Sequence, residues 1–123
     1  MKIIFIIKDQ FLVRKIQNAI SEVYECFYFS SIDEAYLHMI LQGFSDIVVI
    51  DYSLDNIKIL DLIESYDIPP FFLITLFETF NEEIISNYYQ DSFGDFFILS
   101  NNIKELNMKL KLYKNHLSNK LNK

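Results

Sequence analysis

One segment, residues 46–51 with the sequence DIVVID, constrains the fold of this chain more than any other. Four consecutive apolar residues of this kind are typical of a strand that is buried on both faces, as in the centre of a parallel sheet. Asp51 stands at the end of this strand. In an open α/β sheet, the carboxyl ends of the strands border the crevice where ligands bind. Asp is also a common turn and helix-capping residue, so the segment alone leaves both a functional and a capping role open.

Apolar runs of strand length alternate with helical patterns along the whole chain. The runs predict five strands, at residues 3–7, 24–29, 46–51, 71–75 and 95–99. Between them, apolar residues recur at the spacing of three and four that is typical of a helix with one buried face. This alternation is the arrangement of repeated βαβ units. The sequence therefore predicts an α/β fold, in which helices cover both faces of a five-stranded parallel sheet.

Three capping boxes mark the expected starts of helices, and they are Ser31 to Glu34, Thr79 to Glu82 and Asn102 to Glu105. The helix after the first box carries Ala35, Leu37, Ile40 and Leu41 at its apolar positions and is expected to end near Gly43. The spacing of apolar residues also predicts a helix at residues 57–66 and another at residues 84–89.

The last predicted helix, at about residues 102–121, carries one long apolar stripe, formed by Leu106, Leu110, Tyr113, Leu117 and Leu121. About 20 helical residues span ~30 Å, which is roughly the diameter of a small domain. The end of this helix is therefore expected to extend beyond the body. Two interpretations stay open, a frayed surface helix and a seam that pairs two copies into a homodimer.

Composition limits the classes of function that remain. The chain has 123 residues, 51% of them hydrophobic, and we expect one domain over residues 1–123. Residues 1–100 hold 5 Lys and Arg against 16 Asp and Glu, which argues against nucleic-acid binding, whereas residues 101–123 hold 6 Lys and one Glu. No apolar run is as long as a membrane span, so we expect a cytoplasmic protein that binds no membrane. Cys26 is the single cysteine, which excludes an internal disulfide and favours a role as core filler in a strand.

Several kinds of enzyme site are excluded. Gly43 and Gly94 are the only glycines, so neither a dinucleotide-binding fingerprint nor a P-loop is present. His38 and His116 fall on separate predicted helices without a second ligand or a nucleophile at suitable spacing, and we expect both to be helix-surface residues. These observations predict that the protein is not an enzyme.

Candidate functional residues follow three strands of the predicted sheet, namely Lys8 and Asp9 after the first, Asp51 after the third and Thr75 after the fourth. With the motif DIVVIDYSL at its centre, the chain resembles the receiver domain of bacterial response regulators over residues 1 to about 118. The resemblance implies a three-layer, flavodoxin-like fold of strand order 2-1-3-4-5. It also implies that Asp51 is the phosphoacceptor, that Asp9 and Asp51 hold a magnesium ion, and that Thr75 and Phe96 form the switch.

The sequence departs from the receiver pattern mainly at the site itself. Lys8 stands where the family has its first acid, and Leu99 stands where it has a lysine. Asp55 and Ile59 replace the usual Pro and Gly of the loop that follows the phosphoacceptor. Replacing a carboxylate by an ammonium group weakens the attraction for a divalent cation, so we expect magnesium binding to be weak and no other cofactor. Losing the lysine removes a cation that would stabilise charge during phosphoryl transfer.

These departures favour a degenerate, or pseudo-receiver, domain that acts in signal transduction as a stand-alone protein-interaction module. Its expected partners are proteins, either a histidine kinase or a downstream effector. The first alternative is a competent receiver that accepts a phosphoryl group on Asp51. The second alternative is a small ligand-binding α/β protein that uses the same crevice.

Overall fold

The structure is a computed structural model of the chain, and it describes residues 1–20, 24–52, 71–88 and 94–121. The predicted helix at residues 57–66 and the loop positions Asp55 and Ile59 lie outside these ranges, as does Tyr89. Among the helices that the structure describes, none is long and apolar enough to cross a membrane.

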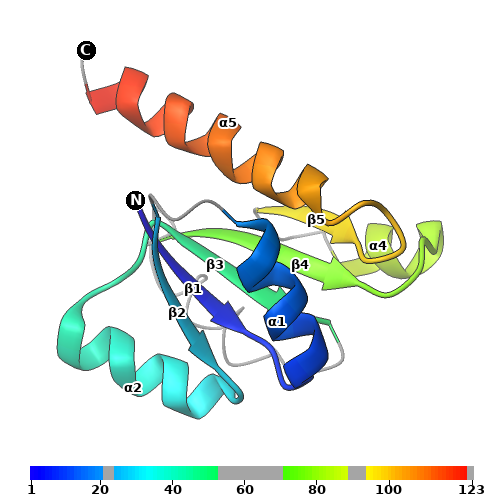
Figure 1. Cartoon of the computed structure of the whole chain (residues 1–123), viewed down its shortest axis with the longest axis horizontal. Coiled ribbons are helices and arrows are strands. Elements are labelled where there is room, and N and C mark those ends of the chain that lie inside the picture. Colours follow the sequence, from blue (N-terminus) through cyan, green and yellow to red (C-terminus); the bar gives the residue numbers. More distant parts are fainter. Residues whose placement is uncertain (21–23, 53–70, 89–93, 122–123) are drawn as a thin grey trace.

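Within the described residues, five parallel strands form one sheet, and they are β1 (Lys2–Ile6), β2 (Glu25–Phe29), β3 (Ile47–Asp51), β4 (Phe72–Phe77) and β5 (Gly94–Ile98). Their order is β2-β1-β3-β4-β5, which confirms the predicted topology (Figure 1). The four apolar residues of the DIVVID segment are completely buried in the central strand β3. A run of β-branched side chains is well suited to this position, because it packs on both faces of the sheet.

The strands begin and end within one or two residues of the predicted limits, and β4 differs most. It runs to Phe77, so Thr75 lies inside the strand, two residues before its end. Leu76 and Phe77 extend the buried apolar run and keep the ladder intact, since they lie opposite Asp51 and Ile98 respectively. The predicted strand is therefore confirmed. The prediction that Thr75 follows the strand was wrong, because Thr75 lies inside it.

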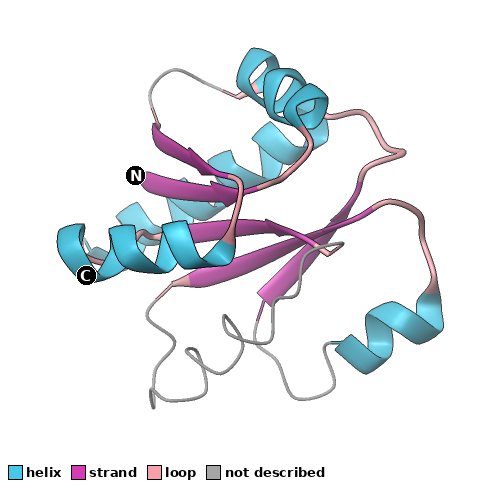
Figure 2. Ribbon diagram, turned by 90° about the horizontal axis from the view of Figure 1, so that it is seen from below, coloured by secondary structure: helices cyan, strands magenta, loops and turns pink. Residues whose placement is uncertain are grey.

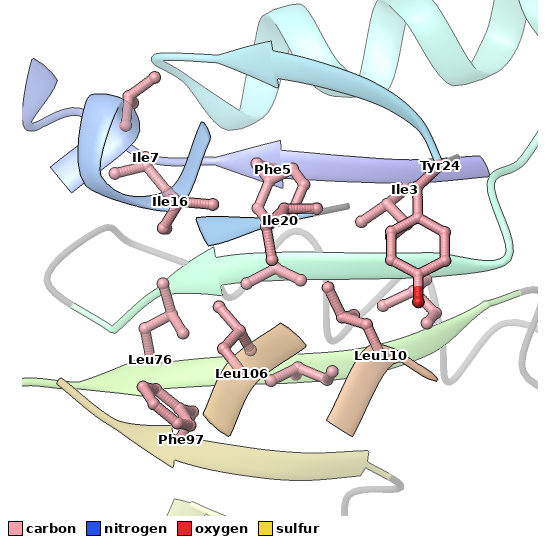
Figure 3. Packing of buried hydrophobic residues seen from close by; sticks show 14 residues of the cluster. Ile3, Phe5, Ile7, Ile16, Ile20, Tyr24, Leu76, Phe97, Leu106 and Leu110 are labelled. Atoms are coloured by element: carbon pink, nitrogen blue, oxygen red, sulfur yellow. The ribbon is translucent and has the colours of Figure 1, made fainter. Parts of the chain in front are cut away.

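Helices cover both faces of the sheet (Figures 1 and 2). On one face, α1 (Gln10–Ala19) and α5 (Lys104–Leu121) pack over a cluster of fourteen buried residues, which we call the larger core cluster. Figure 3 shows side chains of this cluster, among them Ile16 of α1 and Leu106 and Leu110 of α5. Cys26, in β2, is half-buried against the same cluster, as predicted for a core filler. Together with the opposite face, this arrangement is a three-layer α/β/α, flavodoxin-like fold.

On the other face, α2 (Ile32–Gln42) packs over β1, β2 and β3. The helix is confirmed, and Gly43 ends it at a φ of 91°, a conformation that favours glycine. The expected apolar positions of α2 were largely wrong, however. Its buried residues are Ile32, Ala35 and Met39, whereas the side chains of Leu37, Ile40 and Leu41 are 57%, 61% and 68% exposed.

His38 also departs from its predicted surface position. Its ring lies 4.7 Å from that of Phe27 and 5.1 Å from that of Phe29, so α2 holds it half-buried against β2. His116 is exposed, as predicted. Helix α4 (Glu82–Tyr88) contributes Ile85 to a small buried cluster with Phe77 of β4 and Ile98 of β5.

The helix caps show which polar residues satisfy the first amide groups of each helix. The hydroxyl of Ser31 accepts a hydrogen bond from the Glu34 amide, as the capping box predicts. Asn102 also accepts a hydrogen bond at the start of the last helix, but from the Lys104 amide and not from that of Glu105. The third prediction was wrong, because Asn81 and not Thr79 caps α4. The Asn81 side chain accepts a hydrogen bond of 3.1 Å from the Ile84 amide. Asn and Thr are both good caps, so their identity alone does not fix the first residue of the helix.

Candidate functional site

The residues singled out by the sequence gather at the carboxyl edge of the sheet. Lys8 and Asp9 follow β1, Asp51 ends β3 and Leu99 follows β5. Lys8 is exposed. Asp9 is exposed as well and caps α1, where its carboxylate accepts a hydrogen bond of 2.9 Å from the Phe11 amide. One oxygen of this candidate metal ligand therefore also has a structural role.

Asp51 is half-buried and is aligned with Leu76 of the neighbouring strand β4. Its backbone is fixed by the ladder, because the next amide, that of Tyr52, donates a hydrogen bond of 2.9 Å to the Leu76 carbonyl oxygen. The Tyr52 ring packs 4.7 Å from the ring of Phe77. A carboxylate held in this way at the edge of a rigid sheet has the position that a nucleophile or a metal ligand needs.

Thr75 and Phe96 lie opposite each other on the adjacent strands β4 and β5. Aligned residues of parallel neighbours project to the same face of the sheet, so the two predicted switch residues are brought together. The Thr75 residue is completely buried, and it is aligned with Ile50, one residue deeper than Asp51.

Phe96 is half-buried, and its ring contacts Phe77 and Lys109. Its ring lies edge-on to the ring of Phe77, with 6.3 Å between the centroids. The ammonium group of Lys109, on α5, lies 5.9 Å from the centroid of the Phe96 ring. A change in the Phe96 rotamer would therefore disturb contacts to both β4 and α5.

Leu99 occupies the position where the receiver pattern has a lysine. Its amide donates a hydrogen bond of 2.8 Å to the Phe77 carbonyl oxygen, which continues the β4–β5 ladder by one residue. Its half-buried side chain packs against the larger core cluster. The neighbours Ile98 and Ser100 are not basic either. This segment therefore brings no cation to the carboxyl edge.

The carboxyl edge also carries the residues that are predicted to bind magnesium. An ion pair of 2.8 Å joins Lys109 to Asp95. A pairing of Lys8 with Asp51 stays a prediction. No group of three or more His, Cys, Asp or Glu side chains that could hold a metal ion occurs within the described ranges. Asp9 and Asp51 are the predicted magnesium ligands at this edge, and the Lys8 ammonium group, which adjoins Asp9 in sequence, opposes the binding of a divalent cation there.

A second polar cluster, which sequence reasoning missed, ties β5 to α5. Asp95 accepts hydrogen bonds of 2.8 Å from the Lys109 ammonium group and 2.6 Å from the Tyr113 hydroxyl. Its other oxygen accepts a hydrogen bond of 2.7 Å from the Phe96 amide. Burial would raise the pKa of Asp95, but these hydrogen bonds outweigh it and lower the pKa below its usual value. In the sequence, the only signal of this cluster is an acid, Asp95, inside a strand pattern, followed in the last helix by Lys109 and Tyr113, which are four residues apart.

Comparison with known proteins gave no match among family models, curated proteins or solved structures. Asp51 is the candidate phosphoacceptor, and Lys8 and Leu99 stand where the receiver pattern has a metal-binding acid and a lysine.

Proposed function

We propose that this chain is a pseudo-receiver, a signalling domain that binds other proteins and transfers phosphoryl groups slowly or not at all. The observation that carries this proposal is the packing of Leu99 against the larger core cluster. A lysine at this position would place its cation near the developing charge of a phosphoryl group, and a cation so placed supplies much of the catalysis in such reactions. The apolar side chain cannot supply that charge.

Lys8 supports the same proposal, because its positive charge opposes the binding of magnesium. Magnesium prefers oxygen ligands and gives up its water shell reluctantly, so it needs a strongly negative site. Asp9, Asp51 and Lys8 together carry a formal charge of about −1 when all three are ionised. Residues 8 and 9 adjoin in sequence, so the ammonium group opposes a cation held by Asp9.

The switch residues support an interaction role, because Thr75 and Phe96 lie side by side and Phe96 contacts Lys109 of α5. A partner that contacts α4, β5 and α5 would sense the position of Phe96. On this surface Ile84 is 41% exposed, beside Ile85, which anchors α4 to the sheet. We propose that proteins of a signalling pathway bind here.

The test is a set of amide NMR spectra of the whole chain, recorded alone, with magnesium, and with magnesium plus beryllofluoride, a mimic of a phosphoryl group. A pseudo-receiver should show little change around Asp9, Asp51 and Thr75 at millimolar magnesium, with or without the mimic. Saturable shifts at these three residues on adding the mimic would refute the proposal and favour a competent receiver with Asp51 as phosphoacceptor. Asp51→Asn is the control, because it removes the anionic ligand with little change in size.

A further inference from the structure

Helix α2 has two apolar stripes, and only one of them contacts the sheet. Ile32, Ala35 and Met39 are buried against β1, β2 and β3. Leu37, Ile40 and Leu41, which we call the α2 outer face, are 57%, 61% and 68% exposed. Their spacing of three and four puts them side by side on the helix. Large contiguous apolar patches on a protein surface mark interaction sites, whereas single exposed apolar side chains are ordinary.

The sequence on both sides of the α2 outer face is acidic. Residues 16–57 include seven Asp and Glu and no Lys or Arg. Two of these acids, Asp33 and Glu34, are exposed in the first turn of α2. A partner for this face therefore needs apolar side chains and positive charge together.

Helix α5 carries a surface of that kind. Its buried residues Leu106 and Leu110 face the sheet, while Met108 and Leu112 are 56% and 60% exposed on the opposite side. The spacing of the helix places the exposed Lys104 and Lys111 beside this pair, and we call these four residues the α5 outer face. The range Lys104–Leu121 holds five Lys and one Glu. The α5 outer face is thus both apolar and basic.

The two outer faces cannot meet within one molecule, because α2 and α5 lie on opposite sides of the sheet (Figures 1 and 2). For the same reason, one neighbouring copy cannot contact both of them at once. A contact between these unlike faces is heterologous, and unless it closes into a ring it continues from copy to copy.

We propose that the α2 outer face of one copy binds the α5 outer face of a second copy, so that the protein associates head to tail. The apolar pairs supply the buried centre of the contact, and the acids of α2 lie against the lysines of α5. The proposal does not depend on phosphoryl chemistry or on magnesium.

The first test is the molar mass of the full chain over a range of concentrations, measured by sedimentation or light scattering. Head-to-tail association predicts a mass that rises past that of a dimer as the concentration increases. Because the acids of α2 would lie against the lysines of α5, raising the salt concentration from about 50 to about 500 mM should weaken the association, as screening shortens the range of charge attraction. A wild-type chain that stays monomeric at the highest concentration would overturn the proposal.

Two variants make the test specific to these faces. In each of them, which we call the blunted variants, glutamine replaces two apolar side chains of one face. The first carries Leu37→Gln and Leu41→Gln on α2, and the second carries Met108→Gln and Leu112→Gln on α5. All four positions are exposed and glutamine suits a helix, so each variant should keep the circular dichroism and melting curve of the wild type. We expect each variant alone to lose self-association by at least about tenfold, since buried anchors dominate such contacts.

Mixing the two blunted variants is the decisive step. Each retains the face that the other has lost, so the mixture should form 1:1 dimers and nothing larger. Phe11→Gln with Phe80→Gln is the matched control, because it removes two exposed apolar side chains elsewhere and should associate like the wild type. If either blunted variant associates alone as strongly as the wild type, or if the mixture stays monomeric, the head-to-tail contact is wrong.

Discussion

The Tyr113 hydroxyl donates a hydrogen bond of 2.6 Å to the carboxylate of Asp95, which links α5 to β5 across eighteen positions of the sequence. The ring of the same tyrosine packs 4.4 Å from that of Phe72 in β4. Tyr113 therefore holds α5 to two strands at once, by one polar and one apolar contact. The first half of the predicted apolar stripe of this helix thus packs on its own sheet, and the side chains of Leu117 and Leu121 lie outside the described residues.

Acid is expected to weaken the attachment of α5 to β5. The pKa of Asp95 is lowered from 3.8, because hydrogen bonds from Lys109, Tyr113 and Phe96 outweigh the effect of burial. A carboxylate with a lowered pKa stabilises the fold fully above the pKa of the unfolded chain, and this contribution disappears as the pH falls through the lower, folded value. The free energy of unfolding, measured with urea, should therefore fall below about pH 4 more steeply in the wild type than in Asp95→Asn. Equal slopes in the two proteins would contradict this assignment.

Gly94 is expected to tolerate no side chain. A Cβ atom at this position would lie 2.4 Å from the carbonyl oxygen of Leu73, its partner in β4, because the two strands approach closely here. Gly94→Ala should lower the free energy of unfolding by about 1–3 kcal/mol, the usual cost of overpacking a tight site. Urea denaturation measures this loss, and a variant as stable as the wild type would show that the strands separate without penalty.

Much of the fold could be predicted because the apolar pattern changes period wherever a strand gives way to a helix. The four buried residues of β3 and the Ser31 cap could be predicted from residues that are adjacent in the sequence. The second helix shows the limit of this reasoning. With Met39 on one side and Leu37, Ile40 and Leu41 on the other, periodicity indicates a helix but not which stripe meets the sheet.

The rest of the candidate site depends on contacts between distant parts of the chain. The depth of Thr75 follows from where the β4 ladder ends, which strand propensity does not fix. His38 is half-buried because Phe27 and Phe29 of β2 lie against it, and Asp95 is held by α5. No local pattern marks these pairings.

Tyr28 is expected to ionise only in strong alkali. Burial and the neighbouring Cys26 raise its pKa from 10.0 to about 12, and its ring stacks 4.8 Å from that of Phe5. A raised pKa means that the neutral phenol stabilises the fold fully below the unfolded value, and that this contribution is lost as the pH rises through the folded value. Absorbance titration should show a step near pH 12 that is missing from Tyr28→Phe. Cys26→Ala should bring the late step to lower pH, and an unchanged step would exclude an effect of the thiol.

Restoring the receiver pattern at two positions is expected to restore phosphoryl-group binding. Lys8→Asp replaces an ammonium group by a carboxylate beside Asp9, which should give magnesium binding that calorimetry detects at millimolar concentration. Adding Leu99→Lys should supply the cation that the site lacks, and only the double variant should bind beryllofluoride tightly. Because Leu99 packs against the larger core cluster, the double variant must first be shown to melt cooperatively. Asp51→Asn in the double variant is the control and should abolish binding of the mimic. Wild-type protein that binds magnesium as tightly as Lys8→Asp would show that Lys8 does not weaken the site.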